Sequence, residues 1–193
     1  MTVVAFQGEL GAFSEEAARI CCGDDAQLLP RHAFTDVVNA VLSRAADCGV
    51  LPLENSLVGQ ISAANEALKG TDLKIVREVS LPIHHCLLAK PGVQVQSVHK
   101  ALSHPAALGQ CTAFFDAHPH IAAELFYDTA GAAKHVASVD DTTIAAIASR
   151  RAAQQYGLAI LAENIEDRAD NRTRFAMFVR SNDLVEELQQ YTS

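Results

Sequence analysis

The sequence contains no run of 18 apolar residues, and its N-terminus has neither the basic region nor the cleavage site of a secretory signal. We therefore expect no membrane-spanning helix, no export and a cytoplasmic location. Basic residues are also few: 15 lysines and arginines face 23 aspartates and glutamates, which gives a net charge of −8. Without a basic field to release counterions, the net charge argues against nucleic acid and anionic membranes as general partners, and an anionic ligand must be bound locally.

Cysteine pairs at Cys-x-x-Cys spacing are absent as well. The five cysteines are Cys21, Cys22, Cys48, Cys86 and Cys111. An odd number with one adjacent pair makes a poor disulfide framework, so we expect reduced, structural thiols rather than a redox or metal role. At 193 residues, 49% of them hydrophobic, the chain is long enough to bury roughly 70% of its unfolded surface without disulfides or metals.

Short apolar runs alternate with segments of helical periodicity along nearly the whole chain. Strands are expected at residues 2–7, 28–29, 48–53, 73–82, 83–89, 100–103, 121–127, 142–148, 158–161 and 175–179. Helices are expected at residues 15–22, 36–45, 95–99, 106–117 and 150–156, with two more that end at Leu68 and begin near Asp128. This alternation predicts an α/β fold of two lobes with mainly parallel sheets and helices on both faces.

Polar residues mark the expected helix starts. The predicted N-caps are Ser14, Thr35, Asp128 or Thr129, and Ser149. A Pro at the first helical position follows Ser103-His104. Asp183 and Glu186 predict a capping box for a final helix with Leu184, Val185 and Leu188 inward.

Two extended segments meet at Pro82, which indicates that the chain leaves one sheet for another near residue 80. The strand at 158–161 is interpreted as the return. We therefore expect a discontinuous first lobe of residues 1–80 and 161–193 and a second lobe of residues 81–160. Hinge closure through the two crossings is expected to bring Ser103 and Thr129 of the second lobe against Asn55 and Thr173 of the first.

Hydroxyl, amide and turn residues gather where strands give way to helices. The clusters are residues 11–14, Asn55-Ser56, Ser103-His104-Pro105, Asp128-Thr129 and Ser149. Open α/β sheets bind ligands at the carboxyl ends of their strands, so these clusters predict a ligand site. A sixth polar stretch, residues 170–175, leads from a charged loop into the last strand and places Thr173 between Arg172 and Arg174.

Five motifs occur in an order that resembles the prephenate dehydratases, over residues 3–180. They are Phe6-Gln7-Gly8-x-x-Gly11-Ala12-Phe13-Ser14, Leu51-Pro52-x-Glu54-Asn55-Ser56-x-x-Gly59, Ser103-His104-Pro105-x-x-Leu108-x-Gln110-Cys111, Thr129-Ala130-x-Ala132-Ala133 and Asn171-x-Thr173-Arg174-Phe175. Each motif is weak alone, but five in register are a strong signal. The resemblance implies a type II periplasmic-binding-protein-like fold with the active site in the inter-lobe cleft.

The same resemblance implies an enzyme, a carbon–oxygen lyase that converts prephenate to phenylpyruvate in L-phenylalanine biosynthesis. Carbon dioxide and hydroxide are lost together, no cofactor is needed, and the family favours a homodimer or homotetramer. Most bacterial members continue into an ACT domain that binds phenylalanine. Because this chain stops at Ser193, we expect no ACT domain and no ACT-mediated inhibition if the chain is complete; allosteric, non-competitive inhibition by phenylalanine would contradict this.

The resemblance carries the family's hydrogen donor to the departing hydroxyl onto Thr173 alone. Serine, threonine and asparagine at helix N-termini suit carboxylate binding, because backbone N–H groups and the helix dipole hold the charge. The candidate substrate contacts are Asn55, Ser56, Ser103, Thr129, Ala130, Arg174 and Phe175. Arg174 is expected either to bind a carboxylate or to position Thr173.

Further motif residues are expected to support the site: Gly11, Ser14, His104, Gln110 and Cys111. His104 is interpreted either as a general base or as a histidine packed at the rim. Gln110 and Cys111 lie within a predicted helix, which favours core packing or support of the site. Ser149 is interpreted as a plain cap and Arg172 as solvated.

No metal site is expected. His84-His85-Cys86 offers ligand types, but neighbouring residues on a strand point to opposite faces, and no second pair at zinc spacing exists. Gly8 and Gly11 resemble the start of a phosphate loop but lack the third glycine of a dinucleotide fingerprint, so a turn is preferred.

Three other functions remain open at the level of the sequence. Arogenate dehydratase acts on a substrate with an amino group in place of the keto oxygen, and no residue separates the two. A non-aromatising prephenate decarboxylase is disfavoured because Thr173 is retained. A small-molecule binding module is disfavoured because it has no need of a donor aimed at a leaving hydroxyl.

Overall fold

The computed structural model describes residues 1–183. Its strands are β1 (Val3–Gln7), β2 (Gln27–Arg31), β3 (Cys48–Asn55), β4 (Gly59–Gln60), β5 (Leu73–Pro82), β6 (Cys86–Ala89), β7 (Lys100–Ser103), β8 (Ala122–Leu125), β9 (Ile144–Ala148), β10 (Ala159–Ala162) and β11 (Arg172–Arg180). Its α-helices are α1 (Phe13–Cys22), α2 (Phe34–Leu42), α3 (Ser62–Leu68), α4 (Pro105–Leu108), α5 (Thr112–Ala117), α6 (Thr129–Ser138) and α7 (Arg150–Tyr156). Two short 3-10 helices are η1 (Val95–Ser97) and η2 (Ser181–Asp183).

The chain divides into two compact units. The first unit contains residues 1–8, 13–82 and the described chain from Arg172 onward, and the second contains residues 9–12 and 83–171. The first crossing therefore lies at Pro82, beside the expected position near residue 80. The second lies at Arg172 rather than near 160, because β10 pairs with β6 of the second unit. The interpretation of residues 158–161 as a return strand is wrong.

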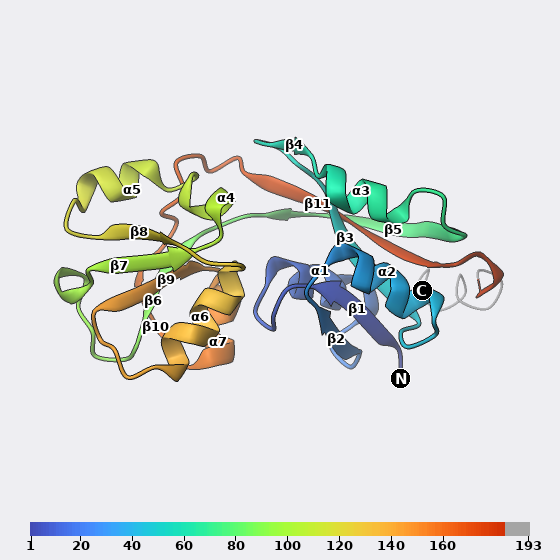
Figure 1. Ribbon diagram of the computed structural model, residues 1–193, viewed down its shortest axis with the longest axis horizontal. Coiled ribbons are helices and arrows are strands. Elements are labelled where there is room, and N and C mark those ends of the chain that lie inside the picture. The colour runs from blue at the N-terminus through green and yellow to red at the C-terminus, as the bar shows by residue number, and fades with distance from the viewer. Residues whose placement is uncertain (184–193) are drawn as a thin grey trace. The chain divides into compact units, whose positions relative to one another are not determined.

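The first unit is built on a six-stranded sheet in the order β2-β1-β3-β11-β5, with β4 paired to β3. β1 is parallel to β2 and β3, whereas β11 runs antiparallel between β3 and β5, as Figure 1 shows. Side-chain alternation divides its core between two faces. Phe178 packs in a cluster with α2 and α3, while Met177 lies on the side of α1, 3.8 Å from Cys22 between sulfur atoms.

The second unit is built on a five-stranded sheet in the order β10-β6-β9-β7-β8. β7 is parallel to β8 and β9, and β6 is antiparallel to β9 and β10. Leu88 and Leu102 pack against α6 and α7, and the alternate residues Leu87 and Ala101 pack against α4 and α5. Figure 1 shows these two pairs of helices on opposite sides of the sheet. The two-lobed α/β class is thus confirmed, with sheets that are more mixed than expected.

The helix expected at 106–117 is two helices, α4 and α5. Gly109 ends α4, and the Asp167 carboxylate from a distant loop accepts hydrogen bonds from the backbone N–H groups of Thr112 and Ala113. Capping from outside the segment starts a new helix at Thr112, which local periodicity does not reveal.

The predicted caps have mixed outcomes. Asp128 and Ser149 are N-caps, as expected, through bonds from Gly131 N and Ala152 N. Ser14 and Thr35 lie inside helices that begin at Phe13 and Phe34, so both cap predictions are wrong.

At α2 the Asp36 carboxylate accepts from the Ala33 N–H, which starts the helix one residue before Thr35. The capping box of Asp183 and Glu186 and the final helix with Leu184, Val185 and Leu188 lie outside the described residues. In the described chain, no helix has the length and apolar character needed to cross a bilayer.

Candidate functional site

Asn55 and Thr173 lie opposite each other in the first unit. Asn55 ends β3, and Thr173 is the second residue of β11, its register partner. Strand β11 begins earlier than the expected start at residue 175, so Thr173 is held by ladder pairs on both sides, to Asn55 and to Leu81. The exposed fractions are only 6% for Asn55 and 7% for Thr173.

A short hydrogen bond joins the two side chains. Asn55 Nδ2 donates to Thr173 Oγ1 at 2.9 Å and to the Arg172 carbonyl at 3.1 Å. Asn55 Oδ1 accepts from the N–H groups of Leu57 and Val58. Among residues 1–183 no group accepts the hydroxyl proton of Thr173, so this proton is available to a ligand.

Ser56 extends the pairing of the same two strands. Its N–H donates to the Arg172 carbonyl at 2.8 Å, and its Oγ accepts from the Arg172 N–H at 2.9 Å. The Arg172 guanidinium, expected to be solvated, donates to the hydroxyl and carbonyl of Ser80. Ser56 is exposed.

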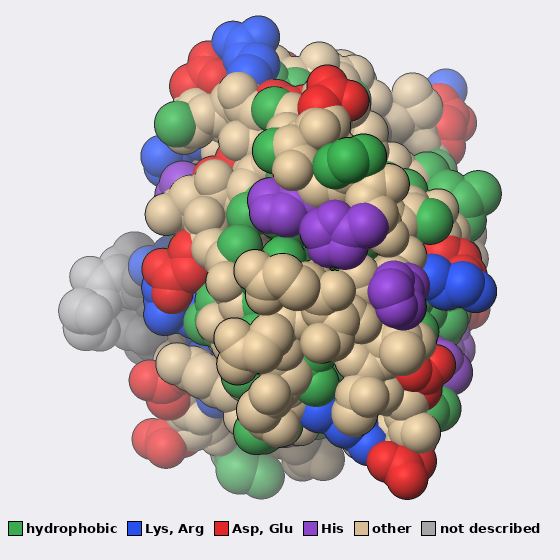
Figure 2. Space-filling view, turned by 90° about the vertical axis from the view of Figure 1, so that its left-hand side faces the viewer, with side chains coloured by type: hydrophobic (Ala, Val, Ile, Leu, Met, Phe, Trp, Pro, Cys, Tyr) green, Lys and Arg blue, Asp and Glu red, His purple; other side chains and the backbone are tan. Residues whose placement is uncertain are grey.

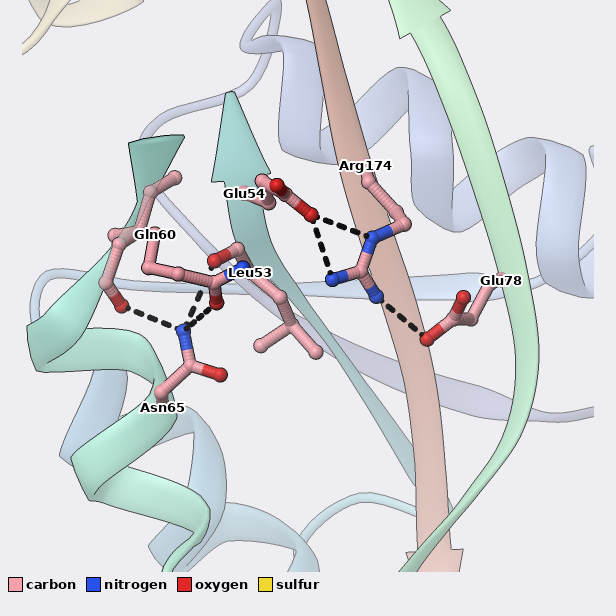
Figure 3. Close-up of polar contacts among 7 residues, drawn as sticks. Leu53, Glu54, Gln60, Asn65, Glu78 and Arg174 are labelled. Carbon is pink, nitrogen blue, oxygen red and sulfur yellow. Dashed lines mark hydrogen bonds and ion pairs between the residues drawn. The ribbon is translucent and has the colours of Figure 1, made fainter. Parts of the chain in front are cut away.

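Arg174 lies between two carboxylates on the same sheet (Figure 3). Its guanidinium bonds to Glu54 at 3.0 Å and to Glu78 at 2.7 Å. The hydrogen bond that Arg174 donates to the Glu54 carboxylate raises the pKa of Arg174 above its ordinary value. Glu54 lies on β3 and Glu78 on β5, so their bonds to Arg174 tie β11 to the strand on each side. The two carboxylates also neutralise the positive charge of Arg174 that would otherwise attract a substrate carboxylate. Phe175, with 2% of its surface exposed, lies in the core.

The second unit collects its predicted residues at one edge of its sheet. β7, β8 and β9 are parallel, so the segments that follow them, beginning at Ser103, Phe126 and Ser149, leave the same edge. The carbonyl of Ser103 accepts from Phe126 N–H, which ties two of these segments together. Ser103 itself is fully buried, and its hydroxyl donates to the Ile147 carbonyl at 2.6 Å. Its proton is therefore not free for a ligand.

Thr129 is the first residue of α6 and is half-buried. Asp128, the N-cap, accepts from Gly131 N–H at 2.8 Å, and burial raises the pKa of its carboxyl. In the described part of the chain the Thr129 hydroxyl has no hydrogen-bond partner. Ala130 is buried and presents no polar side chain.

His104 is the N-cap of α4: its Nδ1 accepts from Ala106 N–H at 3.2 Å. In this bond Nδ1 is the acceptor, so the neutral ring carries its proton on Nε2. The imidazole is exposed. This geometry gives His104 a structural task and leaves the general-base interpretation untested.

A buried polar network surrounds Gln110. Its Oε1 accepts from Asn171 Nδ2 at 2.9 Å and lies 3.0 Å from Nε2 of His85. Burial lowers the pKa of His85, so the ring is neutral and donates through Nε2. Gln110 therefore fixes Asn171 at the end of the charged loop. Cys111 is buried, and burial raises the pKa of its thiol to about 12, which excludes a reactive thiolate.

Glu166 anchors the charged loop, although no sequence motif singled it out. Its carboxylate bonds to His84 Nδ1 at 2.6 Å and to the His85 N–H at 2.8 Å. The same absence of a local signal applies to Glu54 and Glu78 around Arg174. These acids bind residues about 80 to 120 positions away, so only a fold reveals them.

Gly11 and Ser149 join residues 9–12 to α7. Ser149 Oγ donates to the Gly11 carbonyl at 2.6 Å. Gly11 has a φ of +90°, and a Cβ there would lie 2.7 Å from the Cα of Ala152. Both observations require glycine at this close approach. Ser14 is buried in the first turn of α1.

Metal ligands do not converge in the described residues. Figure 2 shows histidines on one face, and in the second unit the rings of His118 and His120 lie 6.0 Å apart. No group of three or more histidine, cysteine or acidic side chains suited to a metal exists within residues 1–183.

Comparisons with known proteins agree with the five motifs. A family model described as prephenate dehydratase matches residues 4–183. Arogenate dehydratase 5 of Arabidopsis thaliana is 44% identical over 178 residues, which are 92% of this chain and 42% of the relative. Arogenate dehydratase/prephenate dehydratase 6 of the same plant is 45% identical over 178 residues, 92% of this chain and 43% of the relative. The chain spans less than half the length of these curated relatives.

Solved structures show the same relationship. The prephenate dehydratase from Arthrobacter aurescens in complex with L-Phe has a TM-score of 0.85 at 32% identity, over 92% of this chain and 60% of that chain. A nutrient binding protein from Burkholderia cenocepacia has a TM-score of 0.51 at 10% identity, over 99% and 89% of the two chains. That second likeness concerns the fold alone and supports the expected binding-protein architecture. By sequence, motifs and fold, this chain belongs to the prephenate dehydratase family.

Proposed function

We propose that this chain catalyses the decarboxylating dehydration of prephenate to phenylpyruvate in L-phenylalanine biosynthesis, without a cofactor. The observation that carries the proposal is the Thr173 hydroxyl. Its oxygen accepts from Asn55, and its proton has no acceptor among the described residues 1–183. Family membership supplies the reaction for which such a donor is suited.

Thr173 is proposed to act on the oxygen that leaves. The electron pair of the bond between the ring and its carboxylate enters the ring as the carbon–oxygen bond breaks. Prephenate, a dianion, then gives the phenylpyruvate anion, carbon dioxide and hydroxide, so atoms and charge balance. Aromatisation makes this step downhill, and the protein need only orient the substrate and stabilise the departing oxygen. A neutral hydroxyl is a weak acid, so we assign Thr173 a hydrogen bond to that oxygen rather than full proton transfer.

The other predicted contacts receive different tasks. The Thr129 hydroxyl has no hydrogen-bond partner within residues 1–183, and Thr129 is the proposed contact to a substrate carboxylate. The Ser103 hydroxyl donates its hydrogen bond to the Ile147 carbonyl, and we propose that Ser103 supports the sheet edge. Arg174, already bound to Glu54 and Glu78, is proposed to position β11 rather than to bind substrate.

Arogenate is the second candidate substrate. Curated relatives at 44% and 45% identity are described as arogenate dehydratases, one of them also as a prephenate dehydratase. The leaving groups of the two substrates are the same, so Thr173 serves either. The choice rests on the keto or amino group of the side chain, away from the bond that Thr173 assists.

The test is to incubate the purified protein with prephenate and, separately, with arogenate. Phenylpyruvate formation, followed by absorbance in alkali, supports the first proposal, and phenylalanine formation supports the second. Thr173→Ala serves as the matched control. Tight binding of either substrate with no turnover would contradict both and favour a binding module.

A further inference from the structure

The amide of Asn55 has only one possible orientation. Its Oδ1 accepts from Leu57 N–H at 2.9 Å and Val58 N–H at 3.2 Å, and its Nδ2 lies 3.1 Å from the carbonyl oxygen of Arg172. Backbone N–H groups only donate and a carbonyl only accepts, so exchanging the two amide ends would break all three bonds. Nδ2 is therefore the end that faces Thr173.

This orientation decides the direction of the bond between the two side chains. An amide nitrogen donates and does not accept, so Thr173 Oγ1, 2.9 Å away, is the acceptor. The hydroxyl proton of Thr173 then points away from Asn55. A donor on the oxygen also polarises the O–H bond, and such chained hydrogen bonds strengthen each other by roughly 10–30%.

We propose that Asn55 is a positioning residue that aims the Thr173 hydroxyl at the leaving oxygen, and that it does not itself contact substrate. Both hydrogens of Nδ2 go to Thr173 and Arg172, and Oδ1 holds the two N–H groups of the following turn. The amide is thus fully engaged by the protein. This inference rests on the proposed function and differs from the substrate contact expected from the sequence.

The charged side chains beside Asn55 on β3 and beside Thr173 on β11 are engaged elsewhere. Glu54, which precedes Asn55, bonds to Arg174, and Arg174 also bonds to Glu78. Arg172 directs its guanidinium to Ser80. A carboxyl placed at position 55 therefore meets Thr173 and the Arg172 carbonyl first.

The variant Asn55→Asp distinguishes a role in orienting the Thr173 hydroxyl from a role in binding substrate. When ionised, one oxygen of the introduced carboxylate still accepts from the N–H groups of Leu57 and Val58. The other oxygen takes the place of Nδ2 and cannot donate to Thr173. The Thr173 hydroxyl must therefore turn and donate its proton to that oxygen. We expect kcat to fall about 10²-fold at neutral pH, as for loss of one transition-state donor, with KM nearly unchanged. As the pH falls and the carboxyl is protonated, it donates again, so the kcat of this variant should rise.

The matched control is Asn65→Asp. Asn65 Nδ2 donates to the carbonyls of Leu53 and Ile61 and lies 3.4 Å from Gln60 Oε1 (Figure 3). The same chemical change there removes structural donors beside β3 without touching Thr173. Its kcat should stay near that of the wild type and follow the wild-type pH profile. Asn55→Ser, too short to reach Thr173, should lose kcat without recovering at acid pH.

The experiment measures kcat and KM from pH 8.5 down to about pH 4, near the ordinary pKa of an aspartate carboxyl, after subtraction of the uncatalysed rate. Melting temperatures report folding. The double variant Asn55→Asp with Thr173→Ala should be no slower than Thr173→Ala alone, because both substitutions remove the same hydrogen bond from Thr173 to the leaving oxygen. Multiplying losses, a change in KM alone, or no rise at acid pH would overturn the inference.

If the wild type turns over neither prephenate nor arogenate, the proposed function fails separately. The wild type, Asn55→Asp, Thr173→Ala and the double variant then form a double-mutant cycle, in which the free energy of unfolding is measured. A coupling between positions 55 and 173 supports the hydrogen bond, and additive losses refute it.

Discussion

Thr173 is the residue whose hydroxyl the proposed chemistry requires. We expect Thr173→Ala to lower kcat by ~10²–10³, because one hydrogen-bond donor to the developing charge is lost, with a much smaller change in KM. Thr173→Ser keeps the hydroxyl and should retain most of the activity. Steady-state kinetics with prephenate measure both, and near-normal turnover by the alanine variant would remove Thr173 from the mechanism.

Gly49 in β3 shows how closely the first unit is packed. A Cβ at this position would lie 2.3 Å from Cζ of Phe178, a ring that is fully buried. We expect Gly49→Ala to lower the free energy of unfolding by about 1–3 kcal/mol through overpacking. Urea denaturation measures this. Gly109→Ala is the control, since its nearest neighbour, the Pro105 carbonyl oxygen, lies 3.4 Å away; an equal loss there would refute the steric explanation.

At the scale of single elements, the N-cap of helix α7 also joins the helix to a segment far away in the sequence. Ser149 Oγ accepts from Ala152 N–H at 3.0 Å and donates to the Gly11 carbonyl. Ser149→Ala should lower the free energy of unfolding by about 1–2 kcal/mol. Ser138→Ala removes a hydroxyl that bonds the His135 carbonyl at an exposed helix end, and chemical denaturation should show little change. Equal losses of stability in the two variants would mean that the Ser149 cap contributes no more than an exposed hydroxyl at a helix end.

At the scale of the whole molecule, acid sensitivity follows from two groups in the second unit. Burial lowers the pKa of His85 from 6.5. Burial acts to raise the pKa of Glu166, but hydrogen bonds from His84 and the His85 N–H outweigh it and lower that pKa below 4.5. Both groups bind protons more readily when unfolded, so each contributes stability above its unfolded pKa that is lost as the pH falls through the folded one.

We therefore compare the wild type with His85→Gln and Glu166→Gln by denaturant unfolding between pH 4 and 8. The stability difference for His85→Gln should begin to shrink below about pH 6.5, and that for Glu166→Gln only below about pH 4.5. Differences that stay constant over this range would show that neither group is linked to folding.

The region shared with the two curated relatives makes up 92% of this chain but only 42–43% of the relatives' own length. A cytoplasmic location and a homo-oligomeric state stay predictions, which fractionation of the source cells and analytical ultracentrifugation measure.

The sequence by itself determined the α/β class, most strands and the motif residues, because alternation, caps and turn residues are local signals. Asp128 and Ser149 cap helices as predicted, since a cap bonds to N–H groups two or three residues ahead. The family was also readable, because five motifs in register exceed what any one motif shows.

Only the tertiary structure decided which unit β10 joins and what each motif residue touches. Cys22 contacts two sulfur atoms, Arg174 a carboxylate and Asn55 a hydroxyl, at separations of 26 to 155 residues along the chain. No local sequence pattern records such long-range contacts. The direction of the hydrogen bond from Asn55 to Thr173 depends on two strands meeting in one register. The motif therefore singles out Thr173 as the proposed catalytic residue, whereas only the fold brings the Asn55 amide against its hydroxyl.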